Sequence, residues 1–435
     1  MSFNSQIPSV EAVDNSFWAV VREAFTGSQR DFTQGSIVAA IVILAVPMII
    51  EMSMESVFAI VDIFFVAKLG ADAVGIVGLT ESILALVYAV GIGLAVGATA
   101  TVARRVGEKD AEGAARAAAH VIYLGIIVSA IMSVIGIIGA PYILLALGGE
   151  PEVIEQGTLF MQIMLGDNAV IVFLFLLNAI FRGAGDAAIA MRVLIFANAL
   201  NIILAPCFIF GVGPFPELGV TGAAVGTTLG RGAGVAYAAW SLFFRTGGRI
   251  SVRAEHWKLD TELLWSLAKL SSTAVLQFLI GTASWSGLIR VIAGFGSVAI
   301  AGYVIGLRVI VFVLLPCAGL ANAAGRLVGQ KLGAGKPERA ASSGWVAAYI
   351  NAAFLGVVGL VFILFSGPVV NIFTTEPDVL FYGRDALHIV AYGFVFYAFG
   401  MVLESSFNGA GDTLTPTYLN LFIFWLFEIP LAYVL

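Results

Sequence analysis

Two nearly identical hexapeptides stand far apart in this chain, and they constrain its fold more than any other feature. FRGAGD occupies residues 181–186, and FNGAGD occupies residues 407–412, at an offset of 226. A second pair, GATATVARRVG from Gly97 and GLANAAGRLVG from Gly319, recurs at an offset of 222 and aligns Arg104 with Arg326. Two repeats in the same order predict a chain built from two similar halves.

The apolar character of the chain decides the solvent in which these halves fold. The mean hydropathy is +0.99 and only 11% of the residues are charged, so the protein cannot cover itself with polar surface and must lie in lipid. The apolar runs are long and lack the alternation of barrel strands, which predicts an all-α polytopic membrane protein. We expect eleven spans, at about residues 36–66, 73–102, 118–147, 158–181, 188–211, 220–244, 263–293, 298–324, 343–365, 386–407 and 414–435.

The distribution of basic residues predicts the orientation. Of the 22 lysines and arginines, 16 fall in the N-terminal segment and in alternate loops, whereas the opposite loops hold Lys68, Arg290 and Arg384. Basic loops stay in the cytoplasm. We therefore expect a multi-pass protein of the cell (inner) membrane with a cytoplasmic N-terminus. Phe17, Val21 and Phe25 recur every fourth residue, which suits a short helix on the membrane surface, although simple disorder is an equal alternative.

Six spans in the first half mean that the second half starts on the same side of the membrane, so the two lobes are parallel repeats. The sequence divides into a cytoplasmic segment (1–32), a six-helix lobe (33–244), a charged cytoplasmic linker (245–261) and a second lobe with five helices (262–435). Shifting the sixth span by 226 predicts a twelfth helix near 446–470, beyond Leu435. We expect a truncated chain, with a natural eleven-helix form as the alternative.

With these motifs placed, the chain resembles the multidrug and toxic compound extrusion (MATE) transporters of bacteria and archaea over roughly residues 35–435. The resemblance rests on PMIIEMSMESVFAIVDIFFVAKLG from Pro47, ADAVG from Ala71, VARRVGEKD from Val102, LVGQKLGAGKPERA from Leu327 and both GAGD turns. It implies twelve helices in two six-helix lobes. It also implies export of organic, often cationic or amphipathic, compounds in exchange for sodium ions or protons.

Three carboxylates in the first span are candidates for coupling. Glu51, Glu55 and Asp62 fall within about 40° of one another on a helix, so they share one face. A charged carboxylate at the bilayer centre costs about 2.5–3.5 kcal/mol, so this face should meet protein or water. The resemblance makes Asp62, fifteen residues after Pro47, the cation-binding acid of the first lobe and a possible Na⁺ site. The alternative is that Asp62 is merely solvated near the outer end of its span. Pro47 should kink the helix or free a carbonyl, either statically or, as the resemblance implies, as part of a bending motion.

The fifth span departs from the pattern that the resemblance implies. The family pattern is Asn-x-x-x-Asp-Pro, whereas this chain reads Asn201-Ile-Ile-Leu-Ala205-Pro206. The second carboxylate is thus replaced by Ala205, and Asp62 is left with neutral oxygens such as those of Asn201 and Asn178. Because hard cations want several charged oxygen ligands, this favours proton coupling over sodium coupling.

Two arginines, Arg231 and Arg308, lie deep in predicted spans. Buried guanidinium groups are usually paired, and we expect Glu81 or Glu404 as partners in structural ion pairs rather than in a substrate contact. In the sixth span, Gly222, Gly226, Gly230 and Gly234 form a stripe of small residues, which predicts close helix packing.

The remaining motifs exclude several function classes. The glycine-rich turns follow no strand and precede no Walker lysine, so we expect no nucleotide site, and nothing indicates nucleic-acid binding. Cys207, Cys317 and the three histidines are scattered, which predicts no disulfide, no metal centre and no cofactor. A membrane enzyme would need a polar catalytic cluster that the sequence does not show. We therefore expect a monomeric secondary antiporter in contact with membrane lipid and with a small organic substrate. The alternative is a lipid-linked precursor flippase, which would need several basic cavity residues.

Overall fold

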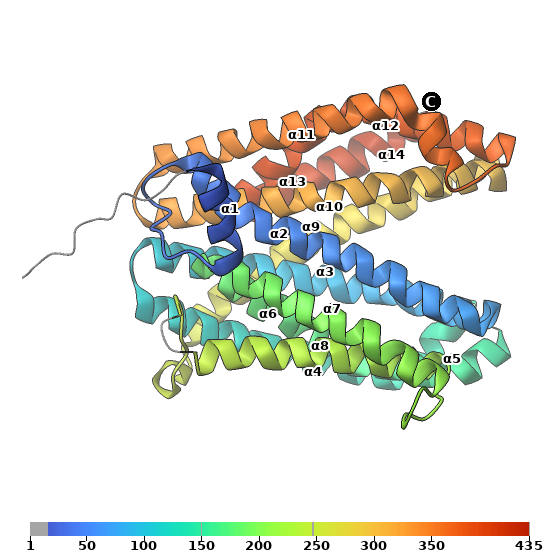
Figure 1. Ribbon diagram of the computed structural model, residues 1–435, viewed down its shortest axis with the longest axis horizontal. Coiled ribbons are helices and arrows are strands. Elements are labelled where there is room, and N and C mark those ends of the chain that lie inside the picture. The colour runs from blue at the N-terminus through green and yellow to red at the C-terminus, as the bar shows by residue number, and fades with distance from the viewer. Residues whose placement is uncertain (1–15, 149, 246–247, 435) are drawn as a thin grey trace, which may run out of the picture.

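The computed structural model describes residues 16–148, 150–245 and 248–434 and is built from long α-helices (Figure 1). Of the predicted N-terminal segment and linker, residues 1–15 and 246–247 lie outside the described residues. The first half contains α1 (Phe17–Thr26), α2 (Ile37–Val66), η1 (Ala67–Leu69), α3 (Ala71–Gly107), α4 (Ala111–Ala146), α5 (Pro151–Gly166), α6 (Asn168–Ala184), α7 (Ala187–Phe210) and α8 (Val220–Phe243). After η2 (Ala254–Trp257), the second half contains α9 (Thr261–Ile292), η3 (Ala293–Phe295), α10 (Ser297–Gly333), α11 (Pro337–Asn371), α12 (Pro377–Ala410), α13 (Leu414–Asn420), the π-helical η4 (Leu421–Glu428) and α14 (Ile429–Val434).

Within the described residues, a helix lies in each of the eleven predicted spans. In the described residues, ten helical segments are long and apolar enough to cross a membrane. The remaining span, α8, has 24 residues and would be about 36 Å long at 1.5 Å per residue, but its glycines, threonines and Arg231 lower its hydropathy. The all-α membrane fold predicted from the sequence is confirmed.

The two halves repeat with a single offset of 226. Helices α3 and α10 have 37 residues each and begin at Ala71 and Ser297. Left-handed glycines close the two GAGD turns, with φ of +89° at Gly185 and +85° at Gly411. The same offset relates Lys109, at φ +60°, to Gly335, at φ +69°. The alignment of Arg104 with Arg326 at offset 222 is therefore wrong, because a slip of four residues is about one helical turn and leaves the same small residues on one face.

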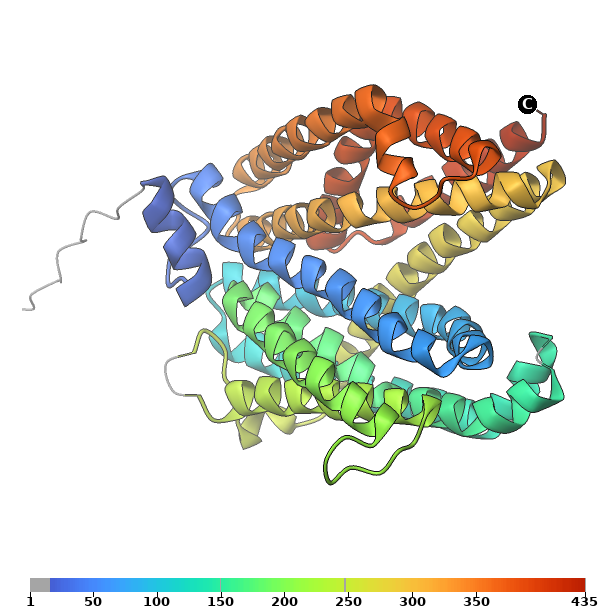
Figure 2. The same ribbon diagram turned by 45° about the vertical axis from the view of Figure 1, so that its right-hand side comes forward.

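Helices α2 to α8 form one group and α10 to α14 the other, with α2 and α3 beside α10 at the centre (Figures 1 and 2). The contact of α3 with α10 is reciprocal at one end. A Cβ on Gly107 would collide with the backbone of Gln330, and a Cβ on Gly333 would collide with the backbone of Arg104. These four residues are equivalent in pairs at offset 226, which is the signature of a two-fold axis between the halves. This supports the prediction of parallel repeats.

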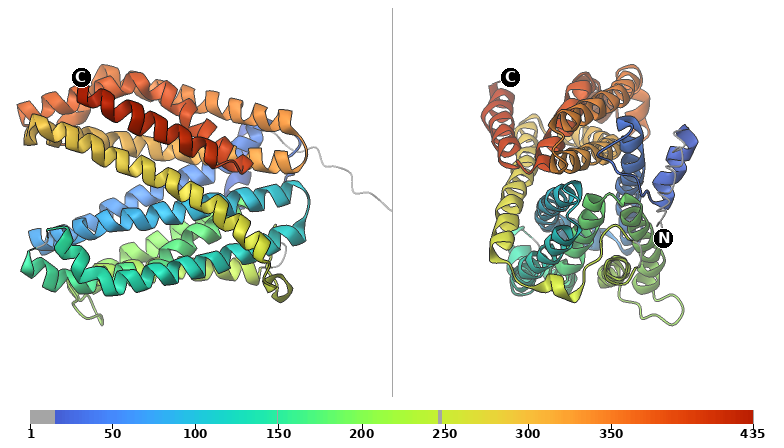
Figure 3. Two further views of the ribbon diagram at one scale, coloured as in Figure 1. Left: turned by 180° about the vertical axis from the view of Figure 1, so that it is seen from behind. Right: turned by 90° about the vertical axis from the view of Figure 1, so that its left-hand side faces the viewer.

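Helix α9 links the two groups. Seen from behind, it runs diagonally from one group to the other (Figure 3). Its first half packs against α3, where Gly97 abuts Ser271 and Gly93 abuts Val275, and its later part lies along α13 and η4. The second half of the chain is thus held to the first by the helix that begins it.

One end of the molecule collects the basic loops, and we call it the basic end. Arg249 donates to the carbonyls of Ser28 and Ala184, and Lys336 donates to the carbonyl of Thr33. The N-terminal segment, for which the sequence left a surface helix and disorder open, forms the helix α1 at the same end (Figure 1). Its Val20 and Ala24 are buried against the helix bundle, whereas Phe17, Trp18 and Phe25 are exposed.

Candidate functional site

The acidic face of α2 points into the protein. Glu51 is buried and forms an ion pair with Arg182 in the last turn of α6. Glu55 is half-buried, and its Oε2 lies 3.4 Å from a guanidinium nitrogen of Arg231 on α8. Asp62 is half-buried, and its Oδ1 is fully enclosed without a hydrogen-bond partner. Two of the three acids are therefore neutralised by arginines, and Asp62 has no such partner within 4 Å among the described residues.

Arg231 is the centre of this site. It is 3% exposed, donates to the hydroxyl of Tyr88 at 2.7 Å, and lies over the ring of Phe58 at 4.5 Å. Its ion pair with Glu55 replaces the partners Glu81 and Glu404 that the sequence suggested, and that expectation is wrong. Because a guanidinium group presents five donors in one plane, it can bind a carboxylate and a phenol at once and so ties α2, α3 and α8 together.

Glu404 and Glu81, the two acids that the sequence suggested as arginine partners, have different surroundings. Glu404 accepts hydrogen bonds from the side-chain amides of Gln277 and, at 3.4 Å, of Asn420. In the second half, amides and not arginines are therefore the partners of this acid. Glu81 and Arg308 are both exposed and attract each other over a distance, but Arg308 forms no ion pair within 4 Å in the described parts of the chain. The prediction that Arg308 is buried and paired is wrong.

The amides of α6 and α7 surround the same region. Asn201 donates to the hydroxyl of Thr227 on α8 at 3.2 Å, and Asn198 donates to the carbonyl of Met54 on α2 at 3.2 Å. The side-chain oxygen of Asn178 is buried without a hydrogen-bond partner. Several neutral oxygens therefore lie inside the first lobe, where a cation or a protonated acid needs ligands.

Ala205 lies at the outer edge of this region. It is buried against Gly226 of α8, in an apolar cluster that includes Val66, one helical turn beyond Asp62. Its methyl group stands where the family pattern has a carboxylate. The glycine stripe of α8 faces α7 here, since Cβ atoms on Gly222 and Gly230 would meet the backbones of Phe208 and Asn201, and the predicted close packing is confirmed.

Pro47 lies within α2, which continues as a helix from Ile37 to Val66. Proline has no N–H, so the carbonyl of Ile43 loses its usual helical partner. Gly319 of α10 packs directly against the backbone of Met48 and Ile49. The weak point of α2 thus lies at the contact between the two halves.

The sequence reasoning missed several charged side chains that lie inside the protein. Arg182 and Arg326 were assigned to cytoplasmic loops, but they are 6% and 3% exposed, and Arg326 contacts the sulfur of Met48 on α2. Asp167 separates α5 from α6 in the middle of the fourth span, whereas the equivalent α12 is unbroken. Its Oδ2 is buried without a hydrogen-bond partner. A helix broken near the midplane is typical of transporter binding sites, and the GDN sequence at 166–168 was the available signal for this break.

One cluster has the composition of a metal site. Glu112, Glu255 and His256 bring their ligand atoms within 4.8 Å of one another at the basic end. However, Nδ1 of His256 accepts the N–H of Arg253 at 2.9 Å, so Nε2 carries the proton and donates to Glu112 at 2.7 Å. Neither nitrogen has a free lone pair for a metal. The histidine instead fastens the segment before α9 to α4.

Comparison with known proteins agrees with this architecture. The chain is 26% identical over 397 residues to the probable multidrug resistance protein NorM of Thermotoga maritima, covering 90% of this chain and 84% of that protein. It is 25% identical over 392 residues to the multidrug export protein MepA of Staphylococcus aureus and 23% identical over 383 residues to a FAD transporter of Shewanella oneidensis. These alignments cover 88% and 86% of this chain and 85% and 83% of those proteins.

Solved structures give the same result. A multidrug resistance MATE transporter of the MOP superfamily in an outward-facing conformation superposes with a TM-score of 0.86 at 26% identity, covering 93% of this chain and 89% of that one. A MOP-superfamily transporter from Pyrococcus furiosus gives the same values. The MatE family model matches residues 47–207 and 274–434, one match in each half. Since these matches cover well over half of its length, the chain belongs to the MatE family of multidrug and toxic compound extrusion transporters.

Proposed function

We propose that the protein is a secondary active antiporter that exports organic compounds from the cell in exchange for protons, with the basic end in the cytoplasm of a cell (inner) membrane. The proposal rests on one observation: the three acids on α2 differ in whether an arginine pairs with them. Arg182 neutralises Glu51 and Arg231 lies against Glu55, while Asp62 keeps a buried oxygen without a partner. A buried carboxylate without a partner is the group most easily neutralised by an incoming cation or proton.

A proton is favoured over a sodium ion at this site. Ala205 of α7 shares an apolar cluster with Val66, which lies one turn beyond Asp62, so this cluster holds a methyl group instead of a second carboxylate. The side chains of Asn201 and Asn178 inside the first lobe offer neutral oxygens. Sodium needs several oxygen ligands and gains affinity from their charge, whereas one carboxylate suffices for a proton. Glu51 and Glu55 act as charge partners that hold the arginines.

The arrangement of the halves supports a state that is closed at the basic end. The reciprocal contacts of Gly107 and Gly333 seal α3 against α10 there. The outer parts of α2 and α9 carry exposed apolar side chains, such as Ile60, Phe64 and Trp285. Protonation of Asp62 removes its charge and lets α2 repack, and the carbonyl freed by Pro47 is the point at which α2 bends most easily.

The acids without an ion pair favour cationic or amphipathic substrates. Glu51 and Glu55 are paired with Arg182 and Arg231, whereas Asp62 and the exposed Glu81 form no ion pair within 4 Å among the described residues. The alternative of a lipid-linked precursor flippase would need basic residues free to hold a pyrophosphate. Arg182 and Arg231 are occupied by carboxylates, the buried Arg326 lies against Met48 of α2, and the exposed Arg308 attracts Glu81. The relative that is a FAD transporter makes an anionic substrate the second candidate to test.

The test is transport by purified protein in liposomes. With an imposed proton gradient, we expect accumulation of a fluorescent organic cation, and with a sodium gradient of equal size we expect little. Uptake without any gradient, or uptake driven only by sodium, would contradict proton antiport. Flavin nucleotide and a lipid-linked pyrophosphate are tested in the same vesicles, and transport of either in place of the cation would overturn the substrate assignment.

A further inference from the structure

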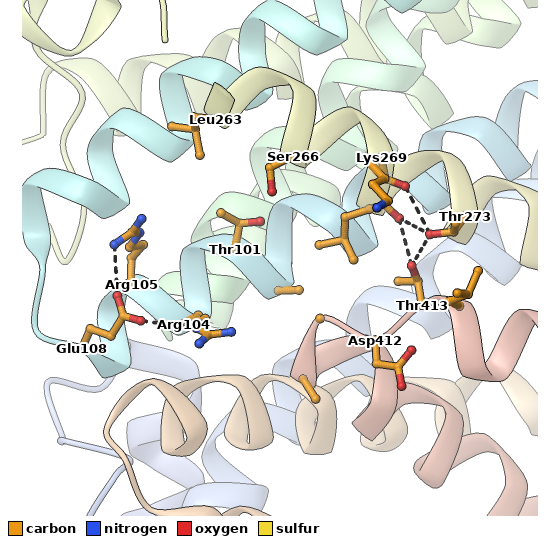
Figure 4. Close-up of a pocket in the computed structure, with 15 residues that line it drawn as sticks. Thr101, Arg104, Arg105, Glu108, Leu263, Ser266, Lys269, Thr273, Asp412 and Thr413 are labelled. Carbon is orange, nitrogen blue, oxygen red and sulfur yellow. Dashed lines mark hydrogen bonds and ion pairs between the residues drawn. The ribbon is translucent and has the colours of Figure 1, made fainter. Parts of the chain in front are cut away.

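A pocket at the seam between the two halves has no role in the transport scheme above. It has a volume of about 550 Å³ and lies near the basic end, where α3 of the first half meets α9 and the α12–α13 turn of the second (Figure 4). Its walls therefore come from both halves. Any molecule bound there touches two bodies that must move relative to each other during transport.

Three basic side chains line the pocket, and the two acids of the lining are fewer. Arg104 and Arg105 both pair with Glu108 on its wall, at 3.3 and 3.2 Å, and Arg105 also pairs with Asp110, outside the lining, at 3.4 Å. Their side chains are 64% and 44% exposed, so these ion pairs are weak and easily exchanged. Lys269 of α9 is exposed and makes no ion pair within 4 Å among the described residues. Three cationic side chains thus line one half-open pocket.

The second carboxylate on the pocket wall, that of Asp412, accepts hydrogen bonds from its own turn. Asp412 accepts hydrogen bonds from the N–H of Thr415 at 3.0 Å and from its hydroxyl at 2.6 Å. These bonds lower the pKa of Asp412, so it stays ionised but its oxygens are engaged. With Glu108 counted as well, the lining keeps a surplus of one positive charge, and the exposed hydroxyl of Ser266 adds a donor.

The part of the pocket nearest the basic end lies at the level of lipid headgroups. Its α9 residues run from Leu263 to Thr273, which places them about 3 to 18 Å from the start of the helix at 1.5 Å per residue. A 32-residue helix is about 48 Å long, which exceeds the 30 Å hydrocarbon core, so its first turns lie in the headgroup layer. Trp265 is 73% exposed on this stretch, as expected for an aromatic side chain at the membrane interface.

Apolar surface continues from the pocket along α9. Leu276 is 51% exposed, about one turn deeper than Thr273 at the pocket wall. Acyl chains can therefore lie against α9 while a headgroup occupies the basic pocket. A free phosphate would use only the polar part of this surface.

We propose that the pocket binds the phosphate of an anionic phospholipid, such as phosphatidylglycerol, from the leaflet at the basic end, with its acyl chains along α9. Basic pockets between membrane helices are known to recognise such headgroups. Arginine and lysine supply the charge-assisted hydrogen bonds that a phosphate diester requires. Because the walls belong to both halves, the bound lipid stabilises the arrangement that is closed at the basic end.

The test uses the purified full chain in a neutral detergent and follows bound lipid by native mass spectrometry and by titration. We expect phosphatidylglycerol to bind and to raise the thermal stability, and phosphatidylcholine and glycerol phosphate to do neither. In the double variant Arg104→Gln and Lys269→Gln, the affinity for phosphatidylglycerol should fall by at least about tenfold, since each basic group near the membrane contributes about 1 kcal/mol. Both side chains are exposed, so the lipid-free stability should stay unchanged.

The matched control is Arg116→Gln, which removes a basic side chain exposed at the same end on α4, outside the pocket lining. It should keep the affinity of the wild type. Equal loss in both variants would show a general charge effect and would overturn the site. Equal binding of glycerol phosphate and phosphatidylglycerol would show a free-phosphate site, and unchanged lipid binding in the double variant would also contradict the proposal. None of these outcomes depends on whether the protein transports protons.

Discussion

Glu51 on α2 and Arg182 on α6 form a buried ion pair in the first half, and the equivalent positions at offset 226 hold Gln277 and Asn408. The second half thus lacks both the acid and the arginine. The structure explains why both are replaced together, because either charge alone would be buried without a partner. It also makes the two lobes unequal, since the acidic α2 face of the first lobe has only neutral residues at its equivalent positions, Gln277, Gly281 and Leu288.

This pair gives the first prediction. Glu51→Gln leaves the Arg182 guanidinium buried and unpaired, and should lower the free energy of unfolding by about 3–5 kcal/mol. The double variant Glu51→Gln with Arg182→Asn recreates the pair of residues found in the second half and should be more stable than Glu51→Gln. Thermal unfolding in detergent measures both. A double variant that is less stable than the single one would refute the compensating role of Arg182.

The second prediction concerns coupling through Asp62. Asp62→Asn cannot exchange a proton, and we expect it to abolish gradient-driven efflux while surface expression and thermal stability stay normal. The control is Asp72→Asn, which changes an exposed acid at the start of α3 and should leave efflux unchanged. If Asp62→Asn transports at the wild-type rate, another group carries the proton, and Asp167 is the next candidate.

A third prediction follows from the contact between α7 and α8. A Cβ on Gly230 would lie 2.8–2.9 Å from the backbone and Cβ of Asn201, whereas a Cβ on Gly287 would meet the terminal Cδ1 of Ile429 at 2.8 Å. A side-chain end can rotate away and a helix backbone cannot. Gly230→Leu should therefore destabilise the protein by about 3 kcal/mol, and Gly287→Leu by clearly less. Equal melting temperatures of the two variants in detergent would count against this packing argument.

The fourth prediction tests the residue that departs from the family pattern. Ala205→Asp places a carboxylate at the close contact of α7 with Gly226 of α8, in the apolar cluster that contains Val66, one turn beyond Asp62. We expect stronger sodium binding, measured by the sodium dependence of transport or of thermal stability, because a second charged oxygen ligand joins the site. Ala205→Asn adds the same bulk without charge and should not respond to sodium. Identical sodium responses of both variants would contradict the assignment.

Several details of the site were open to sequence reasoning, and others were not. The fifteen-residue spacing of Pro47 and Asp62 and the glycine stripe of α8 are local patterns, and the structure places these residues in a common bundle. The pairing of Arg231 with Glu55 is not local, since 176 residues separate them. At offset 226, the sequence already aligns Glu51 with Gln277 and Arg182 with Asn408. The sequence reasoning missed this correspondence because it aligned the second repeat at offset 222.

The sequence by itself determined the solvent, the helices and the duplication of this protein. These properties follow from apolar run lengths and from repeats along the chain, which do not depend on how helices are rotated. Only the tertiary structure decided that Arg182 and Arg326 are buried, that Arg308 is exposed and that Asp62 is the acid of α2 without an arginine partner. Each of these outcomes depends on the rotation and crossing of helices, which close packing of small residues such as Gly107, Gly230 and Gly333 fixes. The charges then take the partners that this packing brings within reach.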